Sequence, residues 1–178
     1  MTDLLTEMNS LNGYGHRPTS DEYFMAMAVL VSSRSTCRRR KVGCILIDKN
    51  KRILATGYNG VAQGQTHCID EPCPGSESES GKDIDQCYAI HAEQNALIQC
   101  SDLTKVYACF STTVPCVMCT KLFLNTTLTR MIYVEAYPQS SISKKLWKQT
   151  KTIGKLDWLM MEESRIKNVI DRTFMASR

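Results

Sequence analysis

The stretch VGCILIDKNKRILATG, residues 42–57, decides the fold. It contains two runs rich in β-branched and aliphatic residues, 42–48 and 52–57, separated by Lys49-Asn50-Lys51. Two such runs joined by a short polar loop are typical of a β-hairpin. We therefore expect the sheet to begin with two antiparallel strands.

Helix and strand patterns alternate on both sides of this hairpin. Thr19 and Glu22 have the spacing of a capping box, which predicts a helix from about Ser20 to Ser33. The elements expected after the hairpin are a helix at 91–99, a strand at 106–111, a helix beginning at Pro115, a strand at 131–135, a helix at 143–150, a strand at 156–161 and a helix at 162–175. This order predicts an α/β fold, a three-layer α/β/α sandwich with a central mixed five-stranded sheet.

The chain length is that of one domain. It has 178 residues, against roughly 150 for a typical domain. We expect one domain over 1–178, with an N-terminal arm at 1–17 that has no sustained periodicity. A long loop insertion is expected at 61–87, where Gly, Pro, Ser and acidic residues dominate.

Composition and charge exclude several classes of protein. The hydrophobic content of 43% and the charged content of 22% exclude collagen, a coiled coil and wholesale disorder. The net charge of +4 suits a phosphorylated small molecule and does not demand nucleic acid. The longest apolar run, Met25 to Val31, is too short to span a membrane. Nine cysteines without a signal-like N-terminus favour the reducing cytoplasm.

Three residues have the type and spacing of zinc ligands: His91, Cys116 and Cys119. Cysteines three residues apart in the first turn of a helix point to the same side, so both sulfur atoms can reach one cation. With the imidazole they supply three ligands and leave the fourth tetrahedral position open, which is typical of catalytic Zn²⁺. The positive end of the helix favours the thiolate form of both cysteines.

Glu93 lies two residues after the predicted ligand His91. We expect it to stay outside the ligand set and to carry protons between water and substrate. The combination of H-x-E with P-C-x-x-C is the signature of zinc-dependent nucleobase deaminases. A C-x-x-C pair by itself could also be half of a structural zinc site or a redox pair, but the combination favours catalysis.

Further motifs resemble those of the deoxycytidylate (dCMP) deaminases of phages and bacteria, in the zinc-dependent cytidine deaminase superfamily. The motifs are Ser35-Thr36-Cys37, Lys41-Val42-Gly43, Thr56 to Gly60, His67-Cys68, His91 to Ala96 and Pro115 to Cys119. The Gly-Tyr-Asn-Gly element within Thr56 to Gly60 distinguishes this family from other nucleoside and polynucleotide deaminases, because the zinc motifs are common to all of them. The resemblance implies hydrolysis of dCMP to dUMP and ammonia for thymidylate synthesis. It also implies a homo-oligomer, commonly a hexamer, controlled by dCTP and dTTP.

The resemblance also implies substrate contacts. They are the sugar hydroxyl at Asn59, the pyrimidine carbonyl at the Ala92 backbone, the base edge at Tyr137 and the pocket wall at Thr112 to Val114. Family members often carry serine directly before Pro-Cys, where this chain has Val114. We therefore expect Thr112 or Thr113 to provide that hydroxyl.

Five cations precede the first strand: Arg34, Arg38, Arg39, Arg40 and Lys41. Such a cluster can receive the phosphate of a mononucleotide. Alternatively, cations at a helix end lie in solvent near the last carbonyl groups. The resemblance also implies an effector site near this region, so the same cations, with Tyr58 and Gly60, could instead bind a regulatory triphosphate and its Mg²⁺.

A second, structural Zn²⁺ is a further hypothesis. Thiolates at Cys37, Cys68, Cys73 and Cys87 could form a closed tetrahedral site that orders the loop insertion. His67 is the substitute ligand if one cysteine points away.

Two other functions compete with dCMP deamination. A nucleic-acid deaminase would use the same zinc chemistry, but it should show an extended basic groove interleaved with aromatic residues. Aromatic residues make up only 7% of this chain, and its cations cluster. A non-catalytic, zinc-stabilised binding module would not need Glu93 at all.

Overall fold

The computed structural model describes residues 17–79, 82–83, 86–137, 140–150 and 157–175. In chain order the elements are α2 (Ser20–Ser32), β1 (Gly43–Ile47), β2 (Ile53–Tyr58), α3 (Ala92–Gln99), the 3₁₀ helix η2 (Leu103–Lys105), β3 (Ala108–Thr113), α4 (Val117–Leu124), β4 (Arg130–Glu135), α5 (Ser140–Gln149), β5 (Asp157–Met160) and α6 (Glu163–Met175). Most of the expected arm, 1–16, lies outside the described residues.

The five strands form one mixed sheet in the order β2-β1-β3-β4-β5. The predicted hairpin pairs β1 with β2 antiparallel, and β1 also pairs antiparallel with β3. β3, β4 and β5 are parallel to one another, so their carboxyl ends meet at one edge of the sheet. The mixed five-stranded sheet predicted from the sequence is confirmed.

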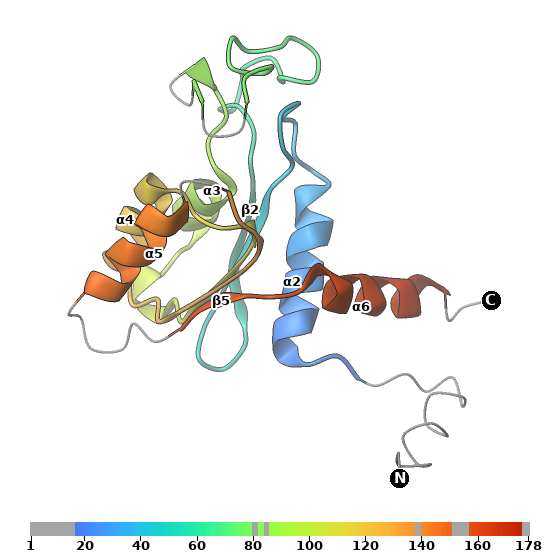
Figure 1. Ribbon diagram of the computed structural model, residues 1–178, viewed down its shortest axis with the longest axis vertical. Helices are drawn as coiled ribbons and strands as arrows, with labels where there is room; N and C mark the ends of the chain where they lie inside the picture. The colour runs from blue at the N-terminus through green and yellow to red at the C-terminus, as the bar shows by residue number, and fades with distance from the viewer. Residues whose placement is uncertain (1–16, 80–81, 84–85, 138–139, 151–156, 176–178) are drawn as a thin grey trace.

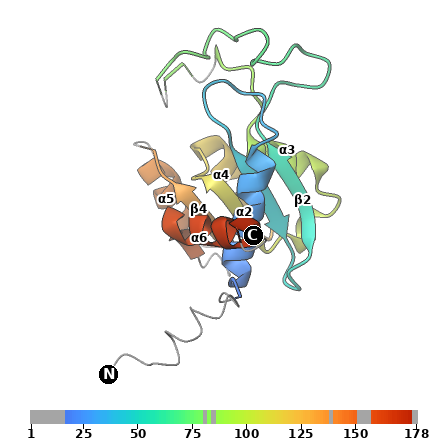
Figure 2. The ribbon, with the colours of Figure 1, turned by 90° about the vertical axis from the view of Figure 1, so that its right-hand side faces the viewer.

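Helices cover both faces of the sheet. Figures 1 and 2 show α2 and α6 on one side and α3, α4 and α5 on the other. Each face has its own apolar cluster: Phe24 and Met25 of α2 pack with Ile45 and Phe110, whereas Phe123 of α4 lies in the cluster on the opposite face. Because strand residues alternate between the two faces, each central strand contributes to both clusters. The three-layer prediction is therefore confirmed.

The capping box at the start of α2 is present as predicted. The Thr19 backbone N–H donates to Glu22 Oε2 over 2.7 Å, and the Glu22 N–H donates to Thr19 Oγ1 over 3.3 Å. These two bonds satisfy two N–H groups that the first helical turn leaves without backbone partners.

Three elements differ from the prediction by two residues or more. The helix expected at 143–150 begins earlier, at Ser140, and ends at Gln149. The helix expected to begin at Pro115 begins at Val117, because Cys116 is its N-cap and has an extended backbone. The strand expected at 106–111 is displaced to Ala108–Thr113, because the 3₁₀ helix at Leu103–Lys105 and the following residues occupy its expected start. The displacement extends β3 to the edge of the sheet where α4 begins.

The loop insertion between β2 and α3 lies beyond that same end of the sheet (Figures 1 and 2). It contains no named helix or strand within its described residues. None of the helices in the described part of the chain is long and apolar enough to cross a bilayer.

Candidate metal centre and substrate cavity

Three of the predicted site residues lie at the N-terminus of α3: His91, Ala92 and Glu93. His91 is the N-cap, with an extended backbone, and its N–H donates to Gln94 Oε1 over 3.0 Å. α3 packs closely on β2, because a Cβ at Gly57 would lie 2.1 Å from the Ala92 carbonyl oxygen. Glycine at position 57 is therefore what allows the helix start to approach the sheet.

α4 supplies the two cysteines. Cys116 is its N-cap, and Cys116 Sγ accepts from the Cys119 N–H over 3.4 Å. The ring atom His91 Nδ1 lies 3.5 Å from Cys116 Sγ and 3.4 Å from Cys119 Sγ. Bond lengths of about 2.3 Å for Zn–S and about 2.05 Å for Zn–N in a tetrahedron place N and S about 3.6 Å apart. The three side chains are thus spaced to share one zinc ion.

The polarity of these groups also suits a cation. The pKa of the Cys116 thiol is lowered to about 4. The hydrogen bond from the Cys119 thiol is the largest cause, and the hydrogen bond from His91 lowers the pKa further. The Cys116 thiolate in turn raises the pKa of His91, and it combines with burial to raise the pKa of the Cys119 thiol strongly. A negative charge held in a half-buried site attracts a metal ion. Among the described residues, His91, Cys116 and Cys119 are the one set of three close enough for this.

Glu93 lies against the trio without belonging to it. Its side chain is buried, with 4% of the residue exposed, and Oε2 is 3.8 Å from Cys119 Sγ. Burial raises the pKa of its carboxyl, so both protonation states are accessible closer to neutral pH. Such a group can take up and release a proton beside the metal centre.

A cavity of about 280 Å³ opens at this site. Its lining residues are Cys37, Arg39, Arg40, Val42, Asn59, Ser78, Cys87, His91, Ala92, Glu93, Thr113, Val114, Cys116 and Tyr137. The volume is close to the lower end, about 300 Å³, of the range for small-molecule sites. The cavity has the metal trio and Glu93 on one part of its wall and two guanidinium groups on another.

Five of the six residues expected to border the substrate line the cavity: Asn59, Ala92, Thr113, Val114 and Tyr137. Thr112 does not, because successive side chains of β3 point to opposite faces of the sheet. Its Oγ1 accepts from the Gly43 N–H over 3.2 Å instead. Burial raises the pKa of the Tyr137 hydroxyl to about 12, which keeps that wall uncharged.

The structure divides the cation cluster. Arg39 and Arg40 line the cavity, whereas Arg34, Arg38 and Lys41 are exposed outside it. The Arg39 guanidinium donates to the carbonyl oxygens of Glu79 and Lys82 in the loop insertion. Arg40 Nη1 lies 3.8 Å from Glu135 Oε2.

Tyr58 and Gly60 of the expected effector site also lie outside the cavity lining. The Tyr58 side chain is exposed, whereas Gly60 is buried against Thr36. The structure therefore does not bring these two residues together with Arg39 and Arg40 in the cavity.

Cys37 and the cysteines of the loop insertion lie close to one another, and two of them, Cys37 and Cys87, line the cavity. Cys37, Cys68 and Cys73 are buried, and the Sγ atoms of Cys68 and Cys73 are 3.8 Å apart. Burial is the largest cause of the raised pKa of the Cys87 thiol, and the nearby Cys37 and Cys73 raise it further. His67 is exposed. The thiols are neighbours, but the side chains do not form a set as tight as the His91 trio.

Sequence reasoning missed two contributors to the cavity. Val42 belongs to an expected strand and to the Lys41-Val42-Gly43 motif, neither of which assigns it a role in the site, and Ser78 lies in a loop without periodicity. Both reach the cavity through the packing of segments that are distant in sequence.

Comparisons with known proteins agree with this geometry. The family model of the cytidine and deoxycytidylate deaminase zinc-binding region matches residues 18–135. The deoxycytidylate deaminase of Schizosaccharomyces pombe is 36% identical over 146 residues, 80% of this chain and 45% of that protein. The deoxycytidylate deaminase of Mycobacterium phage D29 is 37% identical over 125 residues, 66% of this chain and 95% of that protein.

A solved structure shows a similar fold. The crystal structure of dCMP deaminase from the cyanophage S-TIM5 in complex with dCMP and dUMP has a TM-score of 0.64 and 28% identity. The similarity covers 82% of this chain and 99% of that one. In contrast, the chain spans less than half the length of the S. pombe relative and of the deoxycytidylate deaminase from Saccharomyces cerevisiae.

Proposed function

The chain belongs to the family of zinc-binding cytidine and deoxycytidylate deaminases, and from this premise we propose that it hydrolyses dCMP to dUMP and ammonia. The proposal is supported most by one cavity that joins a metal-binding trio, a buried carboxyl group and two arginines. This combination suits a ligand that carries a reactive ring at one end and an anion at the other.

In the proposed reaction His91, Cys116 and Cys119 hold the zinc ion. Zinc bound there supplies an activated water for attack on C4 of the pyrimidine. Glu93 accepts a proton from the water, donates it to ring nitrogen N3 and then carries a second proton to the departing amino group. One C–O bond forms, the exocyclic C–N bond breaks, and ammonia leaves.

The remaining cavity residues are proposed to position the nucleotide. Asn59 contacts the sugar, the Ala92 backbone contacts the pyrimidine carbonyl, and Thr113 and Tyr137 border the base. Arg39 and Arg40 are proposed to receive the phosphate, since guanidinium groups bind phosphate with two parallel hydrogen bonds. This assignment is supported by their place in the cavity lining.

Regulation and assembly are proposed from family membership. The exposed cations Arg34, Arg38 and Lys41, with Tyr58 and Gly60, would bind a dCTP or dTTP effector, with Mg²⁺ on its phosphates. We propose a homohexamer and a single deaminase domain that includes the arm at 1–17. A free nucleotide substrate would place the protein in the cytoplasm.

A second, structural Zn²⁺ is proposed for the loop insertion. Its support is the burial of Cys37, Cys68 and Cys73 and the 3.8 Å separation of the last two sulfur atoms. Cys87 or His67 would complete the four ligands. A metal there would hold Cys87 and Ser78 at the cavity wall.

Steady-state assays with zinc-loaded protein test the proposed function. We expect turnover of dCMP, slower turnover of deoxycytidine, and none of single-stranded DNA or tRNA. Activity confined to the polymers would instead establish a nucleic-acid deaminase. If the protein binds zinc and is folded but deaminates none of these substrates, a non-catalytic binding module would be favoured.

A further inference from the structure

The Asn59 amide is almost fully occupied within the protein. Its Oδ1 accepts from the Val42 N–H over 2.8 Å and from the Ser35 hydroxyl over 2.7 Å, and its Nδ2 donates to the Arg40 carbonyl over 2.8 Å. A backbone N–H can only donate and a carbonyl can only accept, so these partners determine the orientation of the amide. One N–H of four hydrogen-bonding positions is left for the cavity.

Three bonds from one amide join the turn after β2 to the segment that carries the arginines. That segment, 35–42, is also tied to the turn by the Asn59 N–H, which donates to the Val42 carbonyl over 3.2 Å. The turn itself is held to α3 by Asn95 Nδ2, which donates to the Tyr58 carbonyl over 2.8 Å. The arginine segment is therefore linked through Asn59 to the helix that carries His91 and Glu93.

Ser35 contributes a further contact to Asn59. It is buried, with 5% of the residue exposed, and its hydroxyl contacts both Asn59 Oδ1 and the Asn59 carbonyl oxygen, the latter over 2.9 Å. The Cys37 N–H donates to Ser35 Oγ over 3.2 Å. The one hydroxyl proton is thus shared between the side chain and the backbone of Asn59, while the hydroxyl oxygen accepts from the Cys37 N–H at the start of the arginine segment.

Holding this segment by neutral groups preserves its charge. Within the described residues, Glu135 is the one carboxylate paired with a cation of the segment, at 3.8 Å from Arg40. Hydrogen bonds to uncharged partners hold the backbone of this segment and the Arg39 guanidinium without neutralising the cations, so the charges of Arg39 and Arg40 remain available at the cavity. An anion arriving in the cavity meets guanidinium groups that are already positioned.

We propose that Ser35 is a positioning residue that acts through Asn59 on the arginine segment and makes the site selective for a phosphorylated substrate. The proposal rests on the proposed deamination of dCMP. Without the Ser35 hydroxyl, the arginines lose a fixed relation to Glu93, whereas the ring-binding part of the cavity keeps its own supports. The sugar contact at Asn59 is common to phosphorylated and unphosphorylated substrates, so any loss beyond that shared contact appears only with a phosphate on the substrate.

The test compares kcat/KM for dCMP and for deoxycytidine in Ser35→Ala. We expect the dCMP value to fall about tenfold or more, mainly through KM, and the deoxycytidine value to stay within about twofold. In an Asn59→Ala background, Ser35→Ala should change the ratio of kcat/KM for dCMP to kcat/KM for deoxycytidine by less than about twofold. The reason is that the Asn59 side chain, through which Ser35 is proposed to act, is already absent.

Ser111→Ala is the matched control, because Ser111 is fully buried and its hydroxyl has no hydrogen-bond partner in the described structure. It should leave the substrate ratio unchanged. If Ser35→Ala does not fold, Ser35→Thr keeps the hydroxyl, and a wild-type ratio in that variant supports the proposal.

The inference would be overturned if Ser35→Ala left the dCMP-to-deoxycytidine ratio of kcat/KM unchanged, or lowered kcat/KM equally for both substrates. It would also be overturned if Ser35→Thr lost the preference for dCMP, or if the wild-type enzyme did not prefer dCMP. A wild-type enzyme with no turnover of dCMP would instead reject the proposed function itself.

Discussion

Burial gives the Glu93 carboxyl group its chemical character. The residue is 4% exposed beside the zinc-ligand trio, and burial raises the pKa of the carboxyl. A carboxyl in water would stay ionised near pH 7 and would be a weak acid catalyst at that pH. The position of Glu93 thus suits both halves of the proposed proton transfer.

Glu93→Gln should remove most of the turnover and leave the fold intact. The amide keeps the shape of the side chain but cannot accept the proton, so we expect kcat for dCMP to fall by about 10²- to 10⁴-fold. Steady-state kinetics measure turnover, zinc content shows whether the metal site is kept, and thermal melting shows whether the fold is intact. Glu71→Gln in the exposed loop is the control, and wild-type turnover in Glu93→Gln would contradict the proposed role.

At the scale of single elements, α2 depends on its N-terminal cap. The pKa of Glu22 is lowered, chiefly by the hydrogen bond from the Thr19 backbone. A lowered pKa in the folded state means that the carboxylate stabilises the protein above its unfolded-state pKa. The contribution is lost as the pH falls through the folded-state value.

Glu22→Gln should therefore lower the free energy of unfolding at pH 7 by about 0.5–1 kcal/mol. The difference from wild type should shrink between pH 7 and about pH 3, because the stabilising charge is progressively lost as the pH falls toward and through the folded-state pKa. Urea unfolding at both pH values measures this. A difference that is constant with pH would show that the charge of Glu22 does not contribute.

The loop insertion is the element whose order depends on the proposed second metal. Elemental analysis should give about two zinc ions per chain, and Cys73→Ser should reduce this to about one. Cys100→Ser is the control, because Cys100 packs against the apolar cluster on the α3 face, away from the loop thiols. One zinc ion per chain in the wild type would remove the second site.

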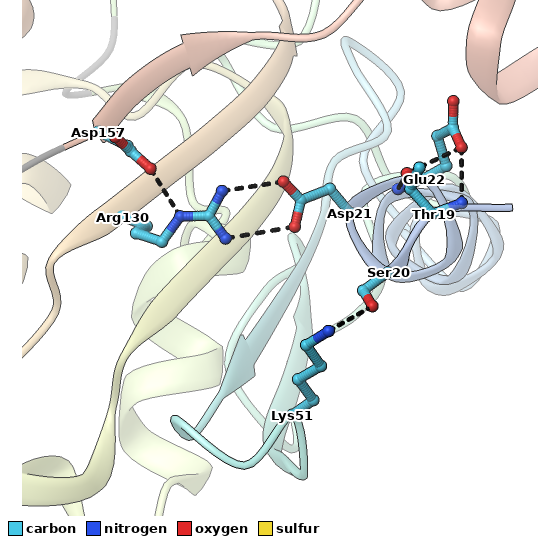
Figure 3. A network of polar contacts seen from close by, with 7 residues as sticks. All are labelled: Thr19, Ser20, Asp21, Glu22, Lys51, Arg130 and Asp157. Carbon is cyan, nitrogen blue, oxygen red and sulfur yellow. Dashed lines mark hydrogen bonds and ion pairs between the residues drawn. The ribbon is translucent and has the colours of Figure 1, made fainter.

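At the scale of the whole molecule, Arg130 connects three elements. It comes from β4, and its guanidinium contacts Asp21 of α2 at 2.9 and 3.3 Å and Asp157 of β5 at 2.6 Å, as Figure 3 shows. Both carboxylates need this cation, because no other cation is paired with either of them within the described residues. The same end of α2 carries the ion pair between Glu22 and Arg165 of α6.

Arg130→Met should lower the free energy of unfolding by about 1–3 kcal/mol, because two partly buried carboxylates lose their shared partner. Lys105→Met removes the exposed pair with Asp102 and should change the free energy of unfolding much less, because solvent screens that pair. Chemical denaturation of both variants tests this. Equal effects would show that Arg130 is only a surface charge.

The sequence alone determined the kinds of elements, their order and the residues of the proposed metal trio. Hairpin signals, the capping box and the H-x-E and P-C-x-x-C spacings act over a few residues, so they can be read locally. For the same reason the fold class was predicted correctly, although the helix after Pro115 begins two residues later than expected.

Only the tertiary structure decided which side chains share the cavity. Thr113 lines it and Thr112 does not, because strand phase sets which face each side chain takes. Arg39 and Arg40 line it while Arg34, Arg38 and Lys41 do not, because the Ser35–Asn59 contacts between distant segments shape that part of the chain. Contacts between segments far apart in sequence depend on the packing of the whole domain, which no local pattern encodes.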